Sequence, residues 1–563
     1  MGRFFSATAL AASLLQGTYA QSTNGTGFFN ALNPGWNLGN TLDAVETEGS
    51  WNNPPVVAST FDDIKNLGYK GIRLPVTWAY HFTSQSPEWK VDPVWLQRVS
   101  DVLDMITSRG FYVIVNVHHD SWTWADLTNA NTNVTAVEER LGKLWYQIGT
   151  KLACKGEKVA FETINEIPGT TAEHGKVINR LNNIFLQSIN DAGGFNPQRV
   201  VTLVGAGEDG YKTINWFERP DTKFKNPWGI QWHYYSPYDF IFGAWGKTTW
   251  GSDADKATLE ADFAAVRGNF SDIPLLIGEW ASSPVQCETA ARWRYFDHLV
   301  RVAAKYTTPT ILWDNGADFL NRATRQWRDP VAQDIYLNAV KGVANALPDS
   351  TTDGAATTQK SSAYIYHKKG TNVTDATLPF HFNGNTVKKI AVAATNKSLA
   401  KDKDYKVVGE SITFTSAFLS TLLTSSAPTG SIANLTLSFN KGASLLINVL
   451  QYSVPTLSVT SSALPATSAD LHIPLTWSGI NRPATVKAVK SDGTFLVDDW
   501  TQYLPVLQQG RTTYGNNWDW DGSSVIIKAG VLDAIRAAGK TTRLTIEFYP
   551  REPGNSVDYT ITV

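Results

Sequence analysis

The sequence predicts a (β/α)8 (TIM) barrel followed by two mostly-β modules of the β-sandwich type. Three observations support this α/β class. Over the first 345 residues, short apolar and β-branched runs alternate with helix-like stretches. A segment rich in Ser, Thr, Ala and Asp interrupts this pattern at 346–362. Strands and turns then dominate the rest of the chain, which predicts β-sandwich modules there.

The barrel prediction depends on eight apolar runs whose ends lie 30 to 49 residues apart. Asp63–Leu67 and Val94–Arg109 show helical spacing between runs. Eight βα units in roughly 300 residues are typical of a barrel. A doubly wound sheet is the alternative, but no Gly-rich phosphate loop follows the first run. The runs are Gly35–Asn40, Gly71–Val76, Phe111–Val117, Val159–Glu166, Arg199–Gly205, Ile230–Tyr235, Leu275–Trp280 and Thr310–Gly316.

The expected domain order is a signal peptide at 1–20, a catalytic barrel at 21–345, a linker at 346–362, and two modules at 363–455 and 456–563. Arg3 and the apolar stretch from Phe4 to Leu15 precede small residues at the cleavage position, as in a secretory signal. No later run of 18 apolar residues occurs, so we expect a soluble, secreted, extracellular protein.

Composition excludes some partners. Lys+Arg 49 against Asp+Glu 51 leaves no basic excess for nucleic acid or an anionic membrane. The two cysteines, Cys154 and Cys287, could pair, but sequence does not show whether they meet. A monomer is expected. Asn-x-Ser/Thr sequons suggest a glycoprotein and lie at Asn24, Asn133, Asn269, Asn372, Asn396 and Asn434.

Candidate catalytic residues stand at the ends of the predicted barrel strands, where barrel enzymes place their active sites. The fourth run ends in Glu166 and the seventh contains Glu279. Two carboxylates at the mouth of one barrel suit glycosidic bond hydrolysis, in which one group gives a proton and the other is ionised. Neither a metal nor an organic cofactor is expected. Other polar or aromatic residues at this face are Arg73, Trp78, His118, His119, Asn165, His233, Tyr235 and Trp313.

These residues, in this order, resemble the motifs of glycoside hydrolase family 5, a family of retaining (β/α)8 hydrolases. The resemblance covers nearly all of 25–345 and includes Gly35–Asn40 and the pair Asn165-Glu166. It implies that Glu166 is the general acid/base and Glu279 the nucleophile. The supporting substrate-binding residues it implies are Arg73, His118, Asn165, His233, Tyr235 and Trp313. One departure is Ile167, since the family usually has Pro directly after the acid/base and here Pro168 follows Ile167.

His118-His119 followed by Asp120-Ser121-Trp122 looks most like subfamily 4, the endo-β-1,4-glucanases and xyloglucanases. That resemblance implies activity on cellulose derivatives, xyloglucan and mixed-linkage glucan, polysaccharides of the plant cell wall. His119 is a further expected substrate-binding residue. Aromatic rings pack against sugar faces, so tryptophans in loops of this face are candidates for sugar stacking: Trp51, Trp122, Trp124, Trp245 and Trp250.

The C-terminal half resembles two accessory modules. Residues 364–455 resemble the immunoglobulin-like X2 module, and 456–563 resemble the family 46 carbohydrate-binding modules. The latter resemblance implies that the last module folds back towards the cleft. Its candidate sugar-binding residues are Trp500, Trp518 and Trp520, and the alternative for Trp518-Asp519-Trp520 is ordinary sandwich core.

Two alternatives stay open at the level of sequence. The chain could be an endo-β-mannanase on the same scaffold, because sequence places the outer subsites poorly. It could also be a non-catalytic carbohydrate-binding protein, although both carboxylates are intact. A retaining mechanism requires carboxyl groups about 5–5.5 Å apart, and a separation of about 9 Å would contradict it.

Overall fold

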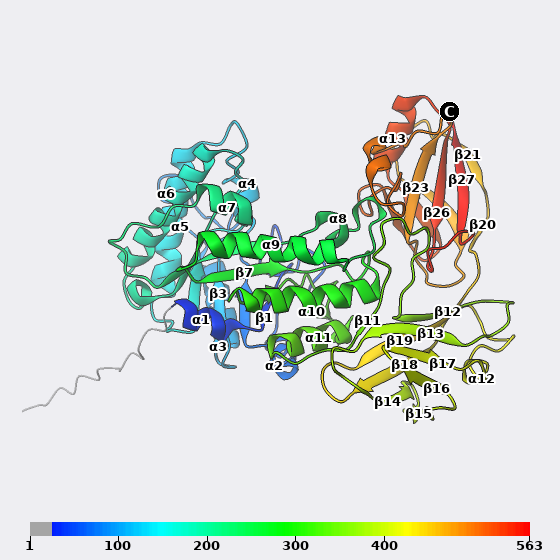
Figure 1. Ribbon diagram of the computed structural model, residues 1–563. Helices are drawn as coiled ribbons and strands as arrows, with labels where there is room; N and C mark the ends of the chain where they lie inside the picture. Colours follow the sequence, from blue (N-terminus) through cyan, green and yellow to red (C-terminus); the bar gives the residue numbers. More distant parts are fainter. Residues whose placement is uncertain (1–24) are drawn as a thin grey trace, which may run out of the picture.

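The computed structural model describes residues 25–563, so the expected signal peptide and the Asn24 sequon lie outside the described part. Its first unit is a closed barrel of eight parallel strands in sequential order, which confirms the predicted fold class (Figure 1). Each strand lies within its predicted run or extends it slightly, and most end before the predicted polar residues. The strands are β1 (Gly35–Asn37), β2 (Gly71–Leu74), β3 (Tyr112–Val115), β4 (Val159–Glu162), β5 (Val201–Val204), β6 (Trp228–Tyr234), β7 (Leu275–Trp280) and β8 (Thr310–Leu312).

Helices surround this barrel because each turns an apolar stripe towards the strands; Ile64 of α2 and Trp145 of α5, for example, are fully buried. The helix α1 instead packs across the amino ends of the strands, where Phe28 and Leu32 join a separate small core. The opposite, carboxyl end of the barrel stays open for loops. The helices are α1 (Gly25–Leu32), α2 (Ala58–Leu67), α3 (Pro93–Thr107), α4 (Asp120–Thr123), α5 (Val134–Lys151), α6 (Ala172–Asp191), α7 (Gly210–Trp216), α8 (Tyr238–Ile241), α9 (Asp253–Asn269), α10 (Thr289–Lys305) and α11 (Pro330–Val340).

Short elements fill the loops of the barrel. The 3-10 turns are η1 (Asn196–Gln198), η2 (Ala206–Glu208) and η3 (Ala244–Gly246), and the hairpin strands are β9 (Leu320–Asn321) and β10 (Gln326–Trp327).

The second unit is a sandwich of two sheets with the strand orders β11-β13-β17-β16 and β12-β19-β18-β14-β15. Alternating burial along β13 and β17 turns one face of each strand inward, as expected for a sandwich. Its elements are β11 (Leu347–Pro348), β12 (Tyr364–Lys368), β13 (Ala376–His381), β14 (Val387–Val392), β15 (Lys397–Ser398), β16 (Tyr405–Val408), β17 (Ser411–Phe414), α12 (Ser416–Leu419), β18 (Gly430–Phe439) and β19 (Leu445–Tyr452).

The third unit has two four-stranded sheets and a single helix against them (Figure 1). Its core is separate from the core that the barrel and the second unit share. Its elements are β20 (Thr456–Leu457), β21 (Ser461–Ala463), β22 (Leu471–Thr476), β23 (Thr485–Lys490), η4 (Asp499–Tyr503), β24 (Trp518–Trp520), β25 (Ser524–Ile527), α13 (Ala529–Ala538), β26 (Thr542–Glu547) and β27 (Ser556–Thr562).

The segment 346–362, expected to be a linker, is packed between the units. Its first residues form β11, which pairs with β13, and Ser350 and Ser361 both donate hydrogen bonds to the buried carboxylate of Glu288 on the barrel. Buried polar contacts of this kind restrict the geometry between units more than a free linker would.

The helices and the cysteines bear on the expectation that the protein is secreted. Among residues 25–563, no helix is both long and apolar enough to cross a membrane. Cys154 is exposed and Cys287 buried, and both are free thiols.

Candidate functional site

The carboxyl ends of the barrel strands bring the two predicted glutamates together. Glu166 lies in the loop after β4, and Glu279 lies near the end of β7. Three atoms lie within 4.8 Å of one another: a carboxylate oxygen of Glu166, a carboxylate oxygen of Glu279 and a ring nitrogen of His233. Two carboxylates that are distant in sequence therefore face the same small volume.

A buried arginine, Arg73 of β2, organises the floor of this site. Its guanidinium forms two hydrogen bonds of 2.7 Å to Glu162 and further bonds to Glu279 (2.5 Å), Asn165 (2.8 Å) and Asn37 (3.0 Å). Burial would raise the pKa of Glu162, but the charge and hydrogen bonds of Arg73 outweigh it and leave that pKa below its ordinary value. Arg73 itself is fully buried, so it orients carboxylates and does not reach the cleft, unlike the substrate contact expected from sequence.

Glu279 is held from two sides. Arg73 bonds one carboxylate oxygen, and the Tyr235 hydroxyl donates to the other at 3.0 Å. Burial raises the pKa of Glu279 above its ordinary value, although the positive charges of His233 and Arg73 oppose that rise. The carboxylate is thus fixed in orientation and remains 5% exposed towards the cleft.

The ring of His233 lies between Glu166 and the buried carboxylate of Glu208. Nδ1 of His233 lies 2.7 Å from Glu166, and Nε2 of His233 lies 3.2 Å from Glu208. Burial lowers the pKa of His233, but Glu208, Glu279 and Glu166 together raise it to about 9. Burial would raise the pKa of Glu166, yet the hydrogen bond and charge of His233 leave it below its ordinary value. The proton of this pair therefore rests on His233, in hydrogen-bond contact with Glu166.

His118 and Trp313 form one wall of the site. The two rings stack with centroids 5.8 Å apart, and Asn116 bridges Nδ1 of His118 to Glu162. Burial brings the pKa of His118 well below its ordinary value, so the imidazole is neutral. A Cβ at Gly39 would lie 2.6 Å from the Trp313 ring, so only glycine lets this ring take its position.

The expected aromatic residues divide into two groups. Trp122 is 55% exposed and stacks on His119 at 3.9 Å, and Trp51 lies 5.4 Å from the same ring, so these side chains line one rim together. Trp250 is 1% exposed and belongs to the core, so its predicted sugar-stacking role is wrong. Trp124 covers the guanidinium of Arg140, a packing role.

The third unit reaches the site. A hollow of about 570 Å³ has Tyr235 and Trp313 on the barrel side and Tyr514 and Trp520 on the other. Trp518 differs from expectation: it is 4% exposed and packs in the core of its own unit, which leaves no face for a sugar.

Contacts through the loop of η3 hold the third unit in this place. The Trp245 indole donates to Asp498 at 2.8 Å and packs edge-on against Trp500, which is 46% exposed. Arg551 also donates to the Gly246 carbonyl oxygen at 2.8 Å. Trp245 and Trp500 are therefore docking residues in this structure.

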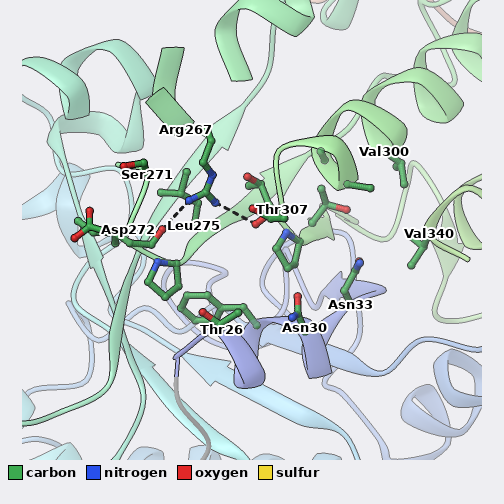
Figure 2. Close-up of a pocket in the computed structure, with 18 residues that line it drawn as sticks. Thr26, Asn30, Asn33, Arg267, Ser271, Asp272, Leu275, Val300, Thr307 and Val340 are labelled. Atoms are coloured by element: carbon green, nitrogen blue, oxygen red, sulfur yellow. Dashed lines mark hydrogen bonds between the residues drawn. The ribbon is translucent and has the colours of Figure 1, made fainter. Parts of the chain in front are cut away.

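Figure 2 shows another hollow, of about 410 Å³, next to α1 at the amino ends of the strands. Its one lining cation, Arg267, is only partly buried and is committed to four backbone carbonyls, those of Phe270, Ile273, Tyr306 and Thr307. A guanidinium occupied in this way serves packing, and no carboxylate pair faces this hollow. The chemistry therefore belongs to the carboxyl end.

Within residues 25–563, two groups each bring three metal-ligand atoms within 4.8 Å of one another. One is Glu166, His233 and Glu279, and the other is Asp43, His118 and His119. In the first, His233 and Glu166 are in direct hydrogen-bond contact, which suits a shared proton. In the second, the carboxylate of Asp43 accepts the backbone N–H groups of Asn40 and Thr41.

Sequence reasoning missed Glu162, Glu208 and Asn116, which all lie at strand ends. Glu208 follows the fifth predicted run by three residues, and Glu162 lies four residues before Glu166. Glu166 was selected because it ends a predicted strand. The same criterion, applied after the fifth run and to every carboxylate of the fourth run, would also have selected Glu208 and Glu162. Nothing in the sequence indicates that they are buried and paired.

Comparisons with known proteins agree with this geometry. Residues 33–319 match the family described as Cellulase (glycosyl hydrolase family 5), and 359–449 match Carbohydrate binding domain X2. Endoglucanase B of Paenibacillus lautus is 30% identical over 510 residues, which cover 86% of this chain and 85% of that protein.

Solved structures resemble the whole described chain. A tri-modular subfamily 4 endo-β-1,4-glucanase of Bacillus licheniformis, complexed with cellotetraose, superposes with a TM-score of 0.84 at 34% identity and covers 96% of this chain and 99% of that one. A full-length tri-modular endo-β-1,4-glucanase of Bacillus halodurans gives a TM-score of 0.81 at 25% identity, covering 96% and 100%.

Proposed function

The chain belongs to glycosyl hydrolase family 5, and from this membership and the site geometry we propose that it is a secreted, retaining endo-β-1,4-glucanase. That it is a glycosyl hydrolase of the endoglucanase kind follows from the family and its relatives. The retaining mechanism, the residue roles and the substrate preference are the proposal. The relatives named above are endoglucanases, and their names give no support to mannan cleavage.

The observation that carries the mechanism is the closeness of the two carboxylates. Oxygens of Glu166 and Glu279 lie within 4.8 Å of each other. A retaining enzyme needs about 5–5.5 Å between its carboxyl groups, whereas an inverting enzyme needs about 6.5–9.5 Å to admit a water. The short separation supports direct attack by one carboxylate.

In the first step, a carboxylate oxygen of Glu279 forms a bond to the anomeric carbon while the bond to the leaving oxygen breaks. Glu166 transfers its proton to that oxygen, which leaves a glycosyl ester on Glu279. In the second step, Glu166 takes a proton from water, the water oxygen bonds to the anomeric carbon, and the ester bond breaks. Both carboxyl groups return to their starting states with configuration retained.

The assignment of roles follows the contacts of each glutamate. Glu279 has two donors, Arg73 and Tyr235, that stabilise its ionised form and orient it for attack. Glu166 contacts the protonated His233, from which a proton can return to it. Asn165 and His118 then remain to bind hydroxyl groups of the sugar, with Trp313 beneath the ring.

We also propose that the last module, which resembles family 46 carbohydrate-binding modules, completes the cleft. Tyr514 and Trp520 share a hollow with Tyr235 and Trp313, which supports a longer binding surface than the barrel alone would offer. Such a surface favours branched or kinked glucans, so xyloglucan and mixed-linkage glucan of plant walls are the proposed substrates. Trp51, Trp122 and His119 would contact sugars at the other rim.

Secretion, removal of residues 1–20, a monomeric state and glycosylation belong to the same proposal. The five sequon asparagines among residues 25–563 are all exposed, which supports their availability: Asn133, Asn269, Asn372, Asn396 and Asn434. Mass spectrometry of the exported enzyme should find Gln21 as its first residue, and an intact Met1 would contradict the proposed cleavage.

The decisive test compares Glu279→Gln with Glu166→Gln on a glucan and on a β-cellobioside with a dinitrophenolate leaving group. Glu279→Gln should abolish turnover of both, because no ester can form. Glu166→Gln should lose about 10²–10⁴-fold on the glucan, the usual share of a general acid. It should lose far less in the first step on the aryl substrate, because dinitrophenolate departs without a proton.

Glu288→Gln is the matched control, since Glu288 is another buried glutamate of the barrel but bonds Ser350 and Ser361. NMR of the first product should show the β anomer. An initial α anomer, or unchanged turnover by Glu279→Gln, would contradict the assigned mechanism.

A further inference from the structure

Glu208 is a fully buried carboxylate for which the proposed mechanism has no use. It ends η2, directly after β5, and its side chain points towards the acid/base loop. One oxygen accepts the backbone N–H of Glu166 at 2.9 Å and lies 3.2 Å from Nε2 of His233. The other oxygen accepts from the Gln231 amide at 3.0 Å.

Together these contacts form a closed circuit. Glu208 lies at ion-pair distance from Nε2 of His233, without the geometry of a hydrogen bond. Nδ1 of His233 lies 2.7 Å from the Glu166 carboxylate, and Glu208 accepts the backbone N–H of Glu166. An imidazole between two carboxylates can carry a proton on either nitrogen. The circuit therefore links the protonation of Glu166 to Glu208 through a single ring.

The backbone conformation also indicates that contacts between Glu208 and Glu166 hold this part of the site in place. Glu166 and Glu208 both have positive φ angles, +41° and +49°, which are uncommon for residues with side chains. Such conformations cost energy and persist only where surrounding contacts hold them. The Glu208–Glu166 bond joins the two, and Gly207 N–H donates to the Ile167 carbonyl oxygen at 2.8 Å beside it.

Among residues 25–563, His233 is the only cation within ion-pair distance of Glu208. Arg73 is already engaged by Glu162 and Glu279, while His118 is neutral. The pKa of Glu208 is raised to about 8, chiefly by burial and further by the negative charge of Glu162. The positive charges of His233 and Arg73 oppose this rise only in part. Carboxylates this close cannot all be ionised, so Glu166, His233 and Glu208 share two protons below about pH 8.

We propose that Glu208 is a positioning residue that, through His233 and the Glu166 backbone, keeps the acid/base supplied with its proton and correctly oriented. This inference rests on the proposed role of Glu166. Before the first step His233 can pass its Nδ1 proton to Glu166, which gives it to the leaving oxygen and then stays ionised. His233 meanwhile keeps its Nε2–H on the side of Glu208. Water returns the proton in the second step, so the circuit redistributes protons without net change.

The test is the pH dependence of kcat/KM for Glu208→Gln. Glutamine keeps the shape and an oxygen acceptor, and below about pH 8 it resembles the protonated carboxyl, so the plateau should be kept. Above that pH, wild-type Glu208 is ionised and holds the proton on His233. An opposite charge at this distance shifts a pKa by about 1–3 units. The basic limb of the variant should therefore move down by about one pH unit or more.

Glu288→Gln is the control, because Glu288 is also a buried carboxylate whose pKa burial raises, and it lies outside the circuit. Its profile should superimpose on that of the wild type. A uniform loss of activity in Glu208→Gln with both limbs in place would overturn the proposal, since it would show a purely structural role. An inactive wild-type enzyme would instead refute the proposed function itself.

A second measurement is made on the wild-type enzyme and does not depend on the folding of Glu208→Gln. In wild-type enzyme labelled with ¹⁵N-histidine, one imidazole should stay protonated to about pH 9, and its signal should vanish in His233→Gln. If His233 loses its proton near pH 6.5, the ordinary value for histidine, Glu208 does not hold that proton and the proposal fails.

Discussion

At the scale of single residues, the site works by pairing buried charges. Arg73 serves two carboxylates and two amide oxygens at once, which suits the fork of donors on a guanidinium and would not suit lysine. Burying these charges is costly unless each has its partner. As a result, the Glu279 carboxylate keeps one orientation, with Arg73 bonded to one oxygen and Tyr235 to the other.

Tyr235→Phe tests the second of these contacts. The hydroxyl stabilises ionised Glu279, so its loss should raise the pKa of Glu279 and move the acid limb of kcat/KM to higher pH. A hydrogen bond to a charged group contributes about 1.5–3 kcal/mol, and one pKa unit is about 1.4 kcal/mol, so a shift of roughly one unit is expected.

Tyr234→Phe is the neighbouring control, because the Tyr234 hydroxyl donates to Asp262 instead. It should leave the acid limb in place. If the two variants give the same acid limb, the Tyr235 hydroxyl does not stabilise ionised Glu279.

At the scale of elements, the loops after the strands carry function and the strands hold them still. The loop after β4 and the turn η2 after β5 are joined by main-chain and side-chain bonds, so Glu166 sits on a braced segment. The strand β24 contributes differently: Trp518 faces the core of its unit, while Trp520 lines the hollow shared with the barrel. Alternation along a strand separates the two roles.

Trp520→Ala should therefore impair xyloglucan and mixed-linkage glucan more than a short soluble cello-oligosaccharide. If the ring contributes about 1.4 kcal/mol to binding, KM on the branched glucan should rise about tenfold with kcat little changed. Steady-state kinetics on the three substrates would measure this.

Tyr503→Ala is the control, since Tyr503 belongs to the same unit, is 83% exposed and lies outside the shared hollow. Equal losses on all three substrates in Trp520→Ala would argue against a role of the module in substrate choice.

At the scale of the whole molecule, the barrel and the second unit share one continuous apolar core, and the third unit has its own. Asn345 lies fully buried where the first two meet. Its amide donates to Asp297 at 2.7 Å and to the Ile335 carbonyl at 3.0 Å, and its side-chain oxygen accepts from the Ala443 N–H at 2.9 Å. One side chain thus ties two helices of the barrel, α10 and α11, to a strand loop of the sandwich.

Asn345→Ala should destabilise the barrel and the second unit together, because it leaves buried polar groups without partners at a cost of about 1–3 kcal/mol. Calorimetry should show the shared unfolding transition at a lower temperature and the transition of the third unit unchanged. Asn338→Ala, which removes a bond within α11 only, is the control. A lowered transition of the third unit would contradict the separation of the cores.

Much of the fold could be predicted because periodicity reports burial. The eight strand runs predicted the barrel, and the closeness of Glu166 and Glu279 was predicted because strand ends in a barrel converge. Trp250 and Trp518 were assigned wrongly for the opposite reason: a tryptophan in a polar neighbourhood of the sequence can still turn its ring inward. Glu162 and Glu208 went unnoticed because a buried carboxylate and a solvated one look alike in sequence.

The sequence by itself determined the order of strands and modules and the placement of Glu166 and Glu279 at one end of the barrel, since these follow from local patterns of apolar and polar residues. Only the tertiary structure decided which groups share protons and which aromatic rings face the cleft. Proton sharing depends on distances of 3 Å or so between residues such as Glu166, His233 and Glu208, which lie on three different strands or their loops. Such distances arise only when the barrel closes and excludes water, and no local pattern encodes them.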